Sequence, residues 1–261
     1  MQSTPKLTIG ILTLNEEKRI ASCIASAQFA DQIVVVDSGS QDKTCEIAAA
    51  LGAEVFHYPD WQGFGVQRNR ILQHAKGDYI FFLDADEEMP AGMQEEIEAV
   101  IKSGKDEIWE VQWNQVAFGR PLTLMKSTGG IQRMFKRQSI REFSGVVHEK
   151  AELNGAQRPV KRFRSRLLHY SRESVYGSLN KLSQYVQLGA AKRAQAGKTG
   201  GVLRGMASGL AIFLRLYVIR RGFMCGAEGF LFCFFIALEC FFRYVALKYD
   251  KNEHTRLSIR K

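Results

Sequence analysis

The sequence predicts an α/β fold, with a mostly parallel sheet flanked by helices in the first half and a helical extension in the second. Apolar runs typical of strands alternate with helical patterns over residues 6–103, which indicates βαβ units. The apolar runs show little polar alternation, so both faces of the strands are expected to be covered. Two of the runs end on aspartate, at the sheet edge where ligands bind in such folds.

Four strands are expected in this half, with a helix after each. The strands cover residues 6–14, 32–37, 53–57 and 79–84, and the helices cover 16–27, 43–51, 63–74 and 91–103. Asn15 can cap the first helix, and Pro90 opens the last. Further strands over 108–115 and 131–135 complete a first domain, residues 1–157, and residues 158–261 are assigned to a basic helical region.

The fourth strand runs directly into an acidic cluster that begins at Asp84 and Asp86. Successive side chains of a strand point to opposite faces, so these two carboxylates can share one side. Neighbouring carboxylates suit a hard divalent cation, Mg²⁺ or Mn²⁺, that carries a phosphorylated ligand. The alternative is a solvated acidic loop at the start of the next helix, because Glu87 and Glu88 follow.

Asp37 ends a second buried strand. A carboxylate only accepts hydrogen bonds, so Asp37 suits a ribose hydroxyl or a base N–H rather than a phosphate. The alternative is an aspartate that stabilises the turn or caps the next helix. A nicotinamide enzyme would carry G-x-G-x-x-G after the first strand, where this chain has Thr13-Leu-Asn-Glu. The chain also lacks the P-loop motif, which disfavours a P-loop ATPase.

The ordered motifs of the first domain resemble glycosyltransferase family 2. They are Thr13-Leu-Asn-Glu16, Val36-Asp-Ser-Gly-Ser-Gln-Asp-Lys-Thr44, Arg68-Asn69, Lys76-Gly-Asp-Tyr-Ile80 and Leu83-Asp-Ala-Asp86. The resemblance implies the GT-A fold and a nucleotide-diphosphate-sugar donor. In this family a D-x-D motif, here Asp84-Ala85-Asp86, holds metal and diphosphate. By the same resemblance, the donor site would include Thr13, Asn15, Glu16, Asp37 at the base or ribose, and Arg68 near the diphosphate or sugar.

Residues 108–150 are expected to serve the acceptor. The resemblance implies that Glu149, in a Val-His-Glu signature, is the general base that deprotonates the acceptor hydroxyl. The alternative is that Glu149 pairs with a lysine or arginine. His148 is the competing base, or orients Glu149. Arg133 is a candidate for donor diphosphate or acceptor phosphate, because a guanidinium binds phosphate oxygens in pairs.

Charge is distributed unevenly along the chain. Residues 1–119 carry 9 Lys and Arg against 19 Asp and Glu, whereas the remaining residues carry 27 against 8. The basic half is expected to meet a polyanion such as an anionic membrane surface or a phosphorylated glycan. Nucleic acid is the alternative from another class, but no nucleic-acid-binding module is recognisable and the acidic half would repel it.

Helices are expected over 172–195, 202–221 and 229–248, the last two rich in Phe, Leu and Ile. Spanning a bilayer needs about 20 mostly apolar residues, and Arg215 and Glu239 interrupt the two apolar runs. We therefore predict helices that lie in the membrane interface, with the apolar side in lipid and the cations on anionic headgroups. A buried helical hairpin in a protein core or dimer interface is the alternative.

The whole chain resembles the lipopolysaccharide core β-glucosyltransferases of the WaaE/KdtX type, including the pattern Tyr217…Gly222-Phe223…Gly226…Gly229-Phe230. That resemblance implies transfer of glucose from UDP-glucose to a heptose of the lipid A–core oligosaccharide, with inversion. The N-terminus lacks the pattern of a signal peptide and the five cysteines form no CxxC pair, so a cytoplasmic enzyme, peripheral on the inner membrane, is expected. Another nucleotide sugar or a polyprenyl-phosphate acceptor is the alternative within the family.

Overall fold

The chain folds into two compact units. The computed structural model describes residues 6–127, 129–145 and 149–250. One unit, here called the sheet unit, comprises Met1–Trp113 and Thr128–His169, and the other, the helical unit, comprises Asn114–Ser127 and Tyr170–Lys261. This division differs from the expected boundary after residue 157, because residues 158–169 belong to the sheet unit and residues 114–127 to the helical unit.

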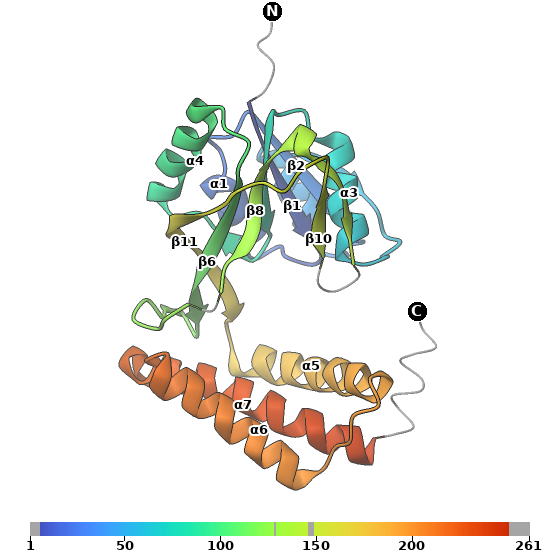
Figure 1. Cartoon of the computed structure of the whole chain (residues 1–261), viewed down its shortest axis with the longest axis vertical. Helices are drawn as coiled ribbons and strands as arrows, with labels where there is room; N and C mark the ends of the chain where they lie inside the picture. Colours follow the sequence, from blue (N-terminus) through green and yellow to red (C-terminus); the bar gives the residue numbers. More distant parts are fainter. Residues whose placement is uncertain (1–5, 128, 146–148, 251–261) are drawn as a thin grey trace, which may run out of the picture. The chain divides into compact units, whose positions relative to one another are not determined.

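A mixed sheet with strand order β3-β2-β1-β4-β8-β6-β11-β5 forms the core of the sheet unit (Figure 1). The parallel strands are β1 (Leu7–Thr13), β2 (Gln32–Asp37), β3 (Glu54–His57) and β4 (Tyr79–Asp84). The others are β5 (Glu87–Glu88), β6 (Ile108–Ala117), β8 (Ile131–Lys136) and β11 (Val160–Arg172), and β7 (Arg120–Pro121) pairs with β6. The expected α/β class is confirmed, and antiparallel pairs beyond β4 complete the sheet.

Both faces of the parallel strands are covered, as their unbroken apolar runs predict. Helices α1 (Ile20–Ser26), α2 (Thr44–Ala50) and α4 (Ala91–Ser103) contribute to one core, and α3 (Phe64–His74) with the hairpin β9 (Ile140–Ser144)–β10 (Lys150–Leu153) contributes to the other. Figure 1 shows α1 and α4 on one side of the sheet and α3 on the other. The side chains of β4 alternate between the two cores, so Asp84 falls on the same side as Phe82 and α3.

The basic segment after residue 157 is a strand of the sheet rather than part of the helical region. Phe163 and Leu167 of β11 are buried in the core of the sheet unit, while basic side chains between them reach acidic partners. The Arg158 guanidinium lies 2.6 Å from Asp106, and Arg162 pairs with Glu110. In the sequence, the many basic residues of this segment make the apolar residues that anchor the strand hard to recognise. Ion pairs with Asp106 and Glu110 neutralise part of the segment's positive charge.

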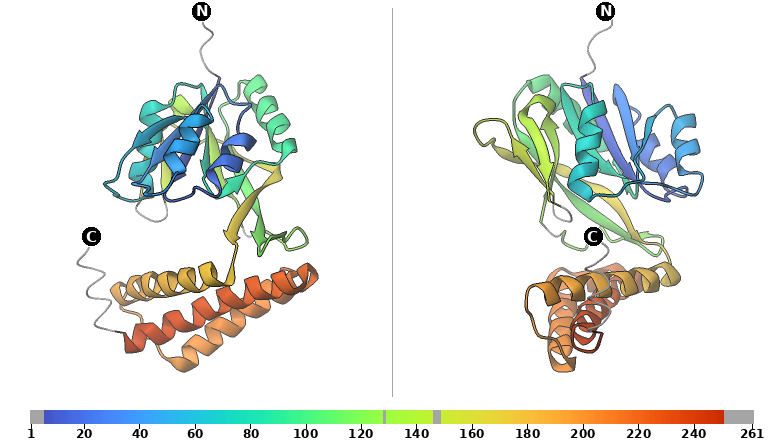
Figure 2. Two further views of the ribbon diagram at one scale, coloured as in Figure 1. Left: turned by 180° about the vertical axis from the view of Figure 1, so that it is seen from behind. Right: turned by 90° about the vertical axis from the view of Figure 1, so that its right-hand side faces the viewer.

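Three α-helices make up most of the described part of the helical unit: α5 (Val175–Gln195), α6 (Val202–Leu214), which continues as a π-helical turn (Arg215–Ile219), and α7 (Gly226–Tyr249). Both α5 and α6 pack against α7 (Figure 2). Gly205 and Gly209 form the contact face of α6. A Cβ atom on Gly205 would stand 2.7 Å from the backbone oxygen of Phe241, so only glycine allows the two helices to approach this closely.

Two segments of the helical unit, Val202–Ile219 and Gly222–Tyr249, are long and apolar enough to cross a membrane by length and composition alone. Glu239, which interrupts the second segment in the sequence, is 7% exposed and its carboxylate pairs with Arg172. The Arg172 guanidinium also lies 5.4 Å from the ring centre of Phe235. The middle of α7 is therefore covered by protein on the side that carries Phe235 and Glu239.

Candidate active site

Asp84 lies at the carboxyl end of β4, held by two buried arginines. Its oxygens accept hydrogen bonds from the Arg133 guanidinium at 3.2 and 2.5 Å, and an Arg68 nitrogen lies 3.6 Å away. Arg133 comes from β8, which pairs with β4, and Arg68 comes from α3, which covers this side of the sheet. Arg133 is 1% exposed and Arg68 is 3% exposed. We call Asp84, Arg133, Arg68 and their other carboxylate partners, Glu87 and Glu149, the arginine clamp.

The pKa values of Asp84 and Glu87, two carboxyl groups of the clamp, shift in opposite directions. Burial alone would raise the pKa of Asp84, but the charges of Arg133 and Arg68 outweigh it and hold that pKa far below the ordinary range. Glu87 is 1% exposed, and its burial raises its pKa despite the 2.8 Å contact with Arg133. The indole N–H of Trp113 also donates to Glu87, at 2.6 Å. Asp84 is thus a charged carboxylate positioned at the ligand-binding edge.

Glu149 is the second carboxylate that Arg68 holds. The Arg68 Nε donates to Glu149 at 2.8 Å, and the Glu149 side chain is 12% exposed. This ion pair is the alternative that the sequence left open. It is also compatible with a role as general base, because the contact with Arg68 fixes the orientation of the Glu149 carboxylate. His148, the competing base, lies outside the described residues.

Asp86 faces a histidine that the sequence did not indicate. His169 of β11 places its Nε2 3.4 Å from the Asp86 carboxylate, and both side chains are 26% exposed. Burial opposes protonation of His169, but its hydrogen bond to Asp86 and the surrounding carboxylates raise its pKa. The pairing of His169 with Glu87 across β11 and β5 brings it here. The donor set of Asp84 and Asp86 is of the hard oxygen type that fits Mg²⁺ or Mn²⁺.

Asp37 lies at the same edge, at the end of β2. Its carboxylate accepts hydrogen bonds from the backbone N–H of Gly39 at 3.0 Å and from the N–H and hydroxyl of Ser40. These contacts hold the pKa of Asp37 below its ordinary value even though burial opposes them. A carboxylate offers about four acceptor positions, and the turn uses three of them. The turn-stabilising alternative therefore describes these contacts. The acceptor position that a ligand could use faces the exposed His57 side chain, whose Nδ1 lies 3.5 Å from the carboxylate.

The residues after β1 and β4 mainly shape the rim of the site. The Asn15 N–H donates to Ser40 and the Glu16 N–H to Thr44, both at 2.8 Å, which ties the first loop to the turn after Asp37. The Ala85 N–H donates to a backbone oxygen of β1. The Thr13 hydroxyl, at the end of β1, is buried and has no hydrogen-bond partner among the described residues, so it can contact a ligand.

A cavity of about 550 Å³ adjoins the clamp within the sheet unit. Arg68 and Glu149 line it, together with Lys150 and Arg158 and with apolar side chains that include Phe135 and Phe143. Its volume lies in the range of small-molecule sites. The candidate base Glu149 therefore lies at the wall of an open cavity whose lining is partly cationic.

The sequence interpretation assigned no site role to three residues: Glu87 and His169, which contact predicted carboxylates, and Trp113, which contacts Glu87. Glu87 directly follows the D-x-D motif, so its position suggested a role in the site. An acidic residue near the start of the next helix explains the same position equally well. Trp113 and His169 reach the site through pairing between strands far apart in the chain, for which the local sequence carries no signal.

Comparison with known proteins gives the following matches. A family model described as "Glycosyl transferase family 2" matches residues 8–142. An "Uncharacterized glycosyltransferase" of Rickettsia bellii is 28% identical over 94% of this chain and 87% of its own length. The "Lipopolysaccharide core biosynthesis glycosyltransferase LpsC" of Rhizobium meliloti is 26% identical over 97% of this chain and 99% of its own length. The crystal structure of S. aureus TarS 1-349 in complex with UDP-GlcNAc is 17% identical, with a TM-score of 0.48 over 65% of this chain and 59% of that one.

Proposed function

The chain belongs to glycosyl transferase family 2, and on this basis we propose that it transfers glucose from UDP-glucose to a heptose of the lipopolysaccharide inner core, with inversion. The arginine clamp, which holds Asp84 and Glu149 through one shared arginine, is the observation that carries the proposal. The lipopolysaccharide acceptor is supported by the name of the LpsC relative, which this chain matches over almost its whole length.

Donor binding is proposed at the carboxyl ends of β1, β2 and β4. Asp84 and Asp86 would hold Mg²⁺ or Mn²⁺, which when bound would neutralise charge on the diphosphate. Asp37 would use its remaining acceptor position for the uridine, and the Thr13 hydroxyl would contact the donor. Arg133 has both terminal nitrogens on carboxylates, so we assign it a positioning role rather than direct contact with phosphate.

Transfer is proposed to begin when Glu149 takes the proton of the acceptor hydroxyl. The hydroxyl oxygen then forms a bond to the anomeric carbon while the bond from that carbon to the UDP oxygen breaks on the opposite side, which inverts the configuration. The hydrogen bond from Arg68 orients the Glu149 carboxylate. The cavity next to Glu149, with Lys150 and Arg158 in its lining, suits a phosphorylated core oligosaccharide.

Calorimetric titration with UDP tests the donor site. We expect UDP to bind in the presence of Mn²⁺ or Mg²⁺ and binding to be lost on adding EDTA. Asp86→Ala should weaken binding by more than the roughly 10–100-fold that loss of an outer metal partner costs. Asp78→Ala is the matched control, since this exposed aspartate precedes the same strand at its opposite end, and it should bind as wild type does.

UDP binding that ignores EDTA, or that Asp86→Ala leaves intact, would contradict the metal site. A panel of nucleotide sugars, with lipid A–core and polyprenyl-phosphate acceptors, then separates UDP-glucose from the alternatives within the family. The nucleic-acid alternative has no support at the site, and the ion pairs of Arg158 and Arg162 remove part of the charge that suggested it.

Membrane association is proposed through the helical unit. A groove of about 510 Å³ between α6 and α7 is lined almost wholly by apolar side chains, among them Met206, Leu210 and Phe234. Leu203 and Leu210 are 82% and 61% exposed, more apolar surface than a water-facing helix normally presents. Because protein covers the Phe235 side of α7, helices lying in the interface of the cytoplasmic leaflet fit better than a span surrounded by lipid.

Flotation with lipid vesicles tests this proposal. Phe234→Asp should weaken binding to vesicles with anionic lipid by about tenfold or more, since burying a phenylalanine is worth about 1.5–3 kcal/mol. Phe64→Asp is the matched control, because Phe64 is 38% exposed against 42% for Phe234 but belongs to the sheet unit. Equal binding of wild type and Phe234→Asp would contradict the assignment of this face to lipid.

A further inference from the structure

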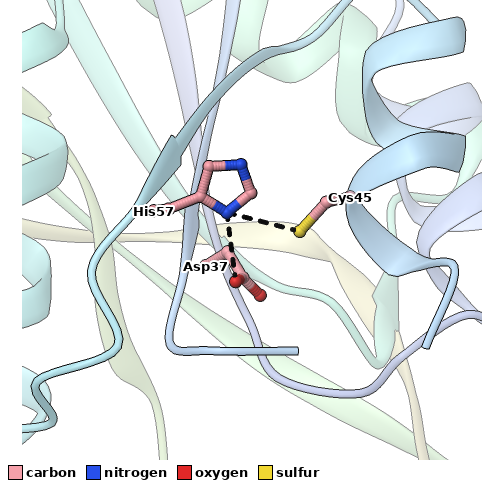
Figure 3. Close-up of side chains that lie close together, drawn as sticks. All are labelled: Asp37, Cys45 and His57. Atoms are coloured by element: carbon pink, nitrogen blue, oxygen red, sulfur yellow. Dashed lines mark hydrogen bonds and ion pairs between the residues drawn. The ribbon is translucent and has the colours of Figure 1, made fainter. Parts of the chain in front are cut away.

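A second constellation of metal-binding side chains lies beside the site, on the outer strands of the parallel sheet. Asp37 ends β2, His57 is its direct partner at the end of β3, and Cys45 is in the first turn of α2. Their donor atoms all lie within 4.8 Å of one another, and they are the described residues that the structure gathers in this way. Figure 3 shows the three side chains pointing toward a common point.

The geometry at His57 distinguishes this cluster from a proton relay. The Asp37 carboxylate lies 3.5 Å from Nδ1 of His57, and the Cys45 sulfur lies 3.9 Å from that same nitrogen. A Cys–His–Asp relay would place the thiol and the carboxylate on different ring nitrogens. Here both converge on one nitrogen, so a proton cannot pass through the ring from one to the other.

We propose that Asp37, Cys45 and His57 form a binding site for a thiophilic divalent cation, Zn²⁺ in the first instance. With Zn–S near 2.3 Å and Zn–N and Zn–O of about 2.0–2.2 Å, tetrahedral ligand atoms stand roughly 3.3–3.7 Å apart. The two separations at His57, 3.5 and 3.9 Å, lie within a few tenths of an ångström of these values, and the Asp37 and Cys45 donor atoms lie within 4.8 Å of each other. Three protein ligands leave the fourth position for water or an added ligand.

The surroundings prepare each ligand for this role. Hydrogen bonds from Gly39 and Ser40 fix the Asp37 carboxylate, as outer partners of metal ligands commonly do. The His57 side chain is 63% exposed, so a cation can enter from solvent. Burial and the charge of Asp37 raise the pKa of Cys45 to about 11, so the thiol proton must leave to solvent on binding. A strongly thiophilic cation can displace that proton, whereas Mg²⁺, which prefers oxygen, would not.

The proposed cation would occupy the acceptor position of Asp37 that the nucleoside is proposed to use. A bound zinc ion and a bound UDP-sugar would therefore compete, which makes zinc an inhibitor at this edge of the sheet. This consequence rests on the proposed function, whereas the cation site itself does not.

Cobalt titration of the nucleotide-free protein, after removal of metals with chelator, tests the site. We expect one Co²⁺ per chain, with the near-ultraviolet band of a cobalt–thiolate bond, and displacement of the cobalt by Zn²⁺. Cys45→Ser should abolish the band, and His57→Ala should weaken the affinity by about tenfold or more. Cys240→Ser is the control for a half-buried thiol elsewhere, and it should leave the band unchanged.

Two outcomes would overturn the proposal: no thiolate band in the wild-type protein, or a band that survives in Cys45→Ser. Because the titration contains no nucleotide, its failure would leave the proposed transferase untouched. Conversely, failure of UDP to bind would not affect the cobalt result.

Discussion

Replacing Arg133 by methionine is expected to lower the free energy of unfolding of the sheet unit by about 3–5 kcal/mol, since removal of one partner leaves buried charges unpaired. Arg133 is the common partner of Asp84 and Glu87, and methionine fills much of its volume without donating. The three tryptophans, Trp61, Trp109 and Trp113, all lie in the sheet unit. Their fluorescence during urea unfolding therefore reports on that unit alone.

Two comparison variants sharpen this test. Arg141 is 60% exposed and reaches only exposed glutamates, so Arg141→Met should cost less than about 1 kcal/mol. The double variant Arg133→Met/Glu87→Met should recover part of the lost stability, because it removes one of the two carboxylates that Arg133→Met leaves without a partner. If Arg133→Met were no less stable than Arg141→Met, the arginine clamp would not hold the fold together.

The deficit of Arg133→Met is also expected to depend on pH. Burial raises the pKa of Glu87 in the folded protein, and loss of Arg133 removes the charge that opposes this rise. A carboxyl with a raised folded pKa binds more protons folded than unfolded, so stability falls as pH rises above the unfolded value of about 4.3. The deficit measured by urea should therefore be smaller at pH 4 than at pH 7.

Replacing Glu149 by glutamine is expected to reduce the rate of sugar transfer by about 10²–10⁴-fold and to leave UDP binding nearly unchanged. The glutamine oxygen can still accept the hydrogen bond from Arg68 Nε, but the amide cannot take the acceptor proton. Transfer is measured as UDP released with the core acceptor, and donor binding by the calorimetric titration. Loss of rate without loss of donor affinity is the mark of a base rather than a binding group.

Glu152→Gln is the matched control for this prediction. Glu152 belongs to the same strand, β10, and its side chain is 44% exposed, so the substitution should leave the transfer rate within a few-fold of wild type. A Glu149→Gln protein with full transfer activity would show that the Arg68–Glu149 pair is structural only.

The parallel half of the sheet was predictable because its signals are local. The apolar runs of β1, β2 and β4 can be recognised residue by residue, as can the carboxylates that end β2 and β4. The structure places Asp37 and Asp84 at those strand ends as expected. The position of β11 was not predictable in this way. Its basic residues dominate the composition, whereas its place in the sheet depends on Phe163 and Leu167 packing into a core made by distant strands.

Charged residues in apolar runs were harder still to interpret. In the sequence, Glu239 is a charged residue that interrupts a hydrophobic segment. The free-energy cost of burying this charge depends on whether a cationic partner lies beside it. That partner, Arg172, is 67 residues away, and the ring of Phe235 covers the pair. The constellation of Asp37, Cys45 and His57 shows the same limit, since none of the spacings between these residues matches a metal motif.

The arginine clamp offsets much of the negative charge at the carboxyl end of β4. Two arginine cations and a histidine face four carboxylates there, so neighbouring cations compensate much of the negative charge. The groups are Arg68, Arg133, His169, Asp84, Asp86, Glu87 and Glu149. A free divalent cation is attracted only weakly to such a surface. A cation already chelated by a diphosphate has its charge neutralised by that ligand, so it depends less on the carboxylates of the protein. For the donor site proposed above, this charge balance favours joint entry of nucleotide and metal over accumulation of free metal ions.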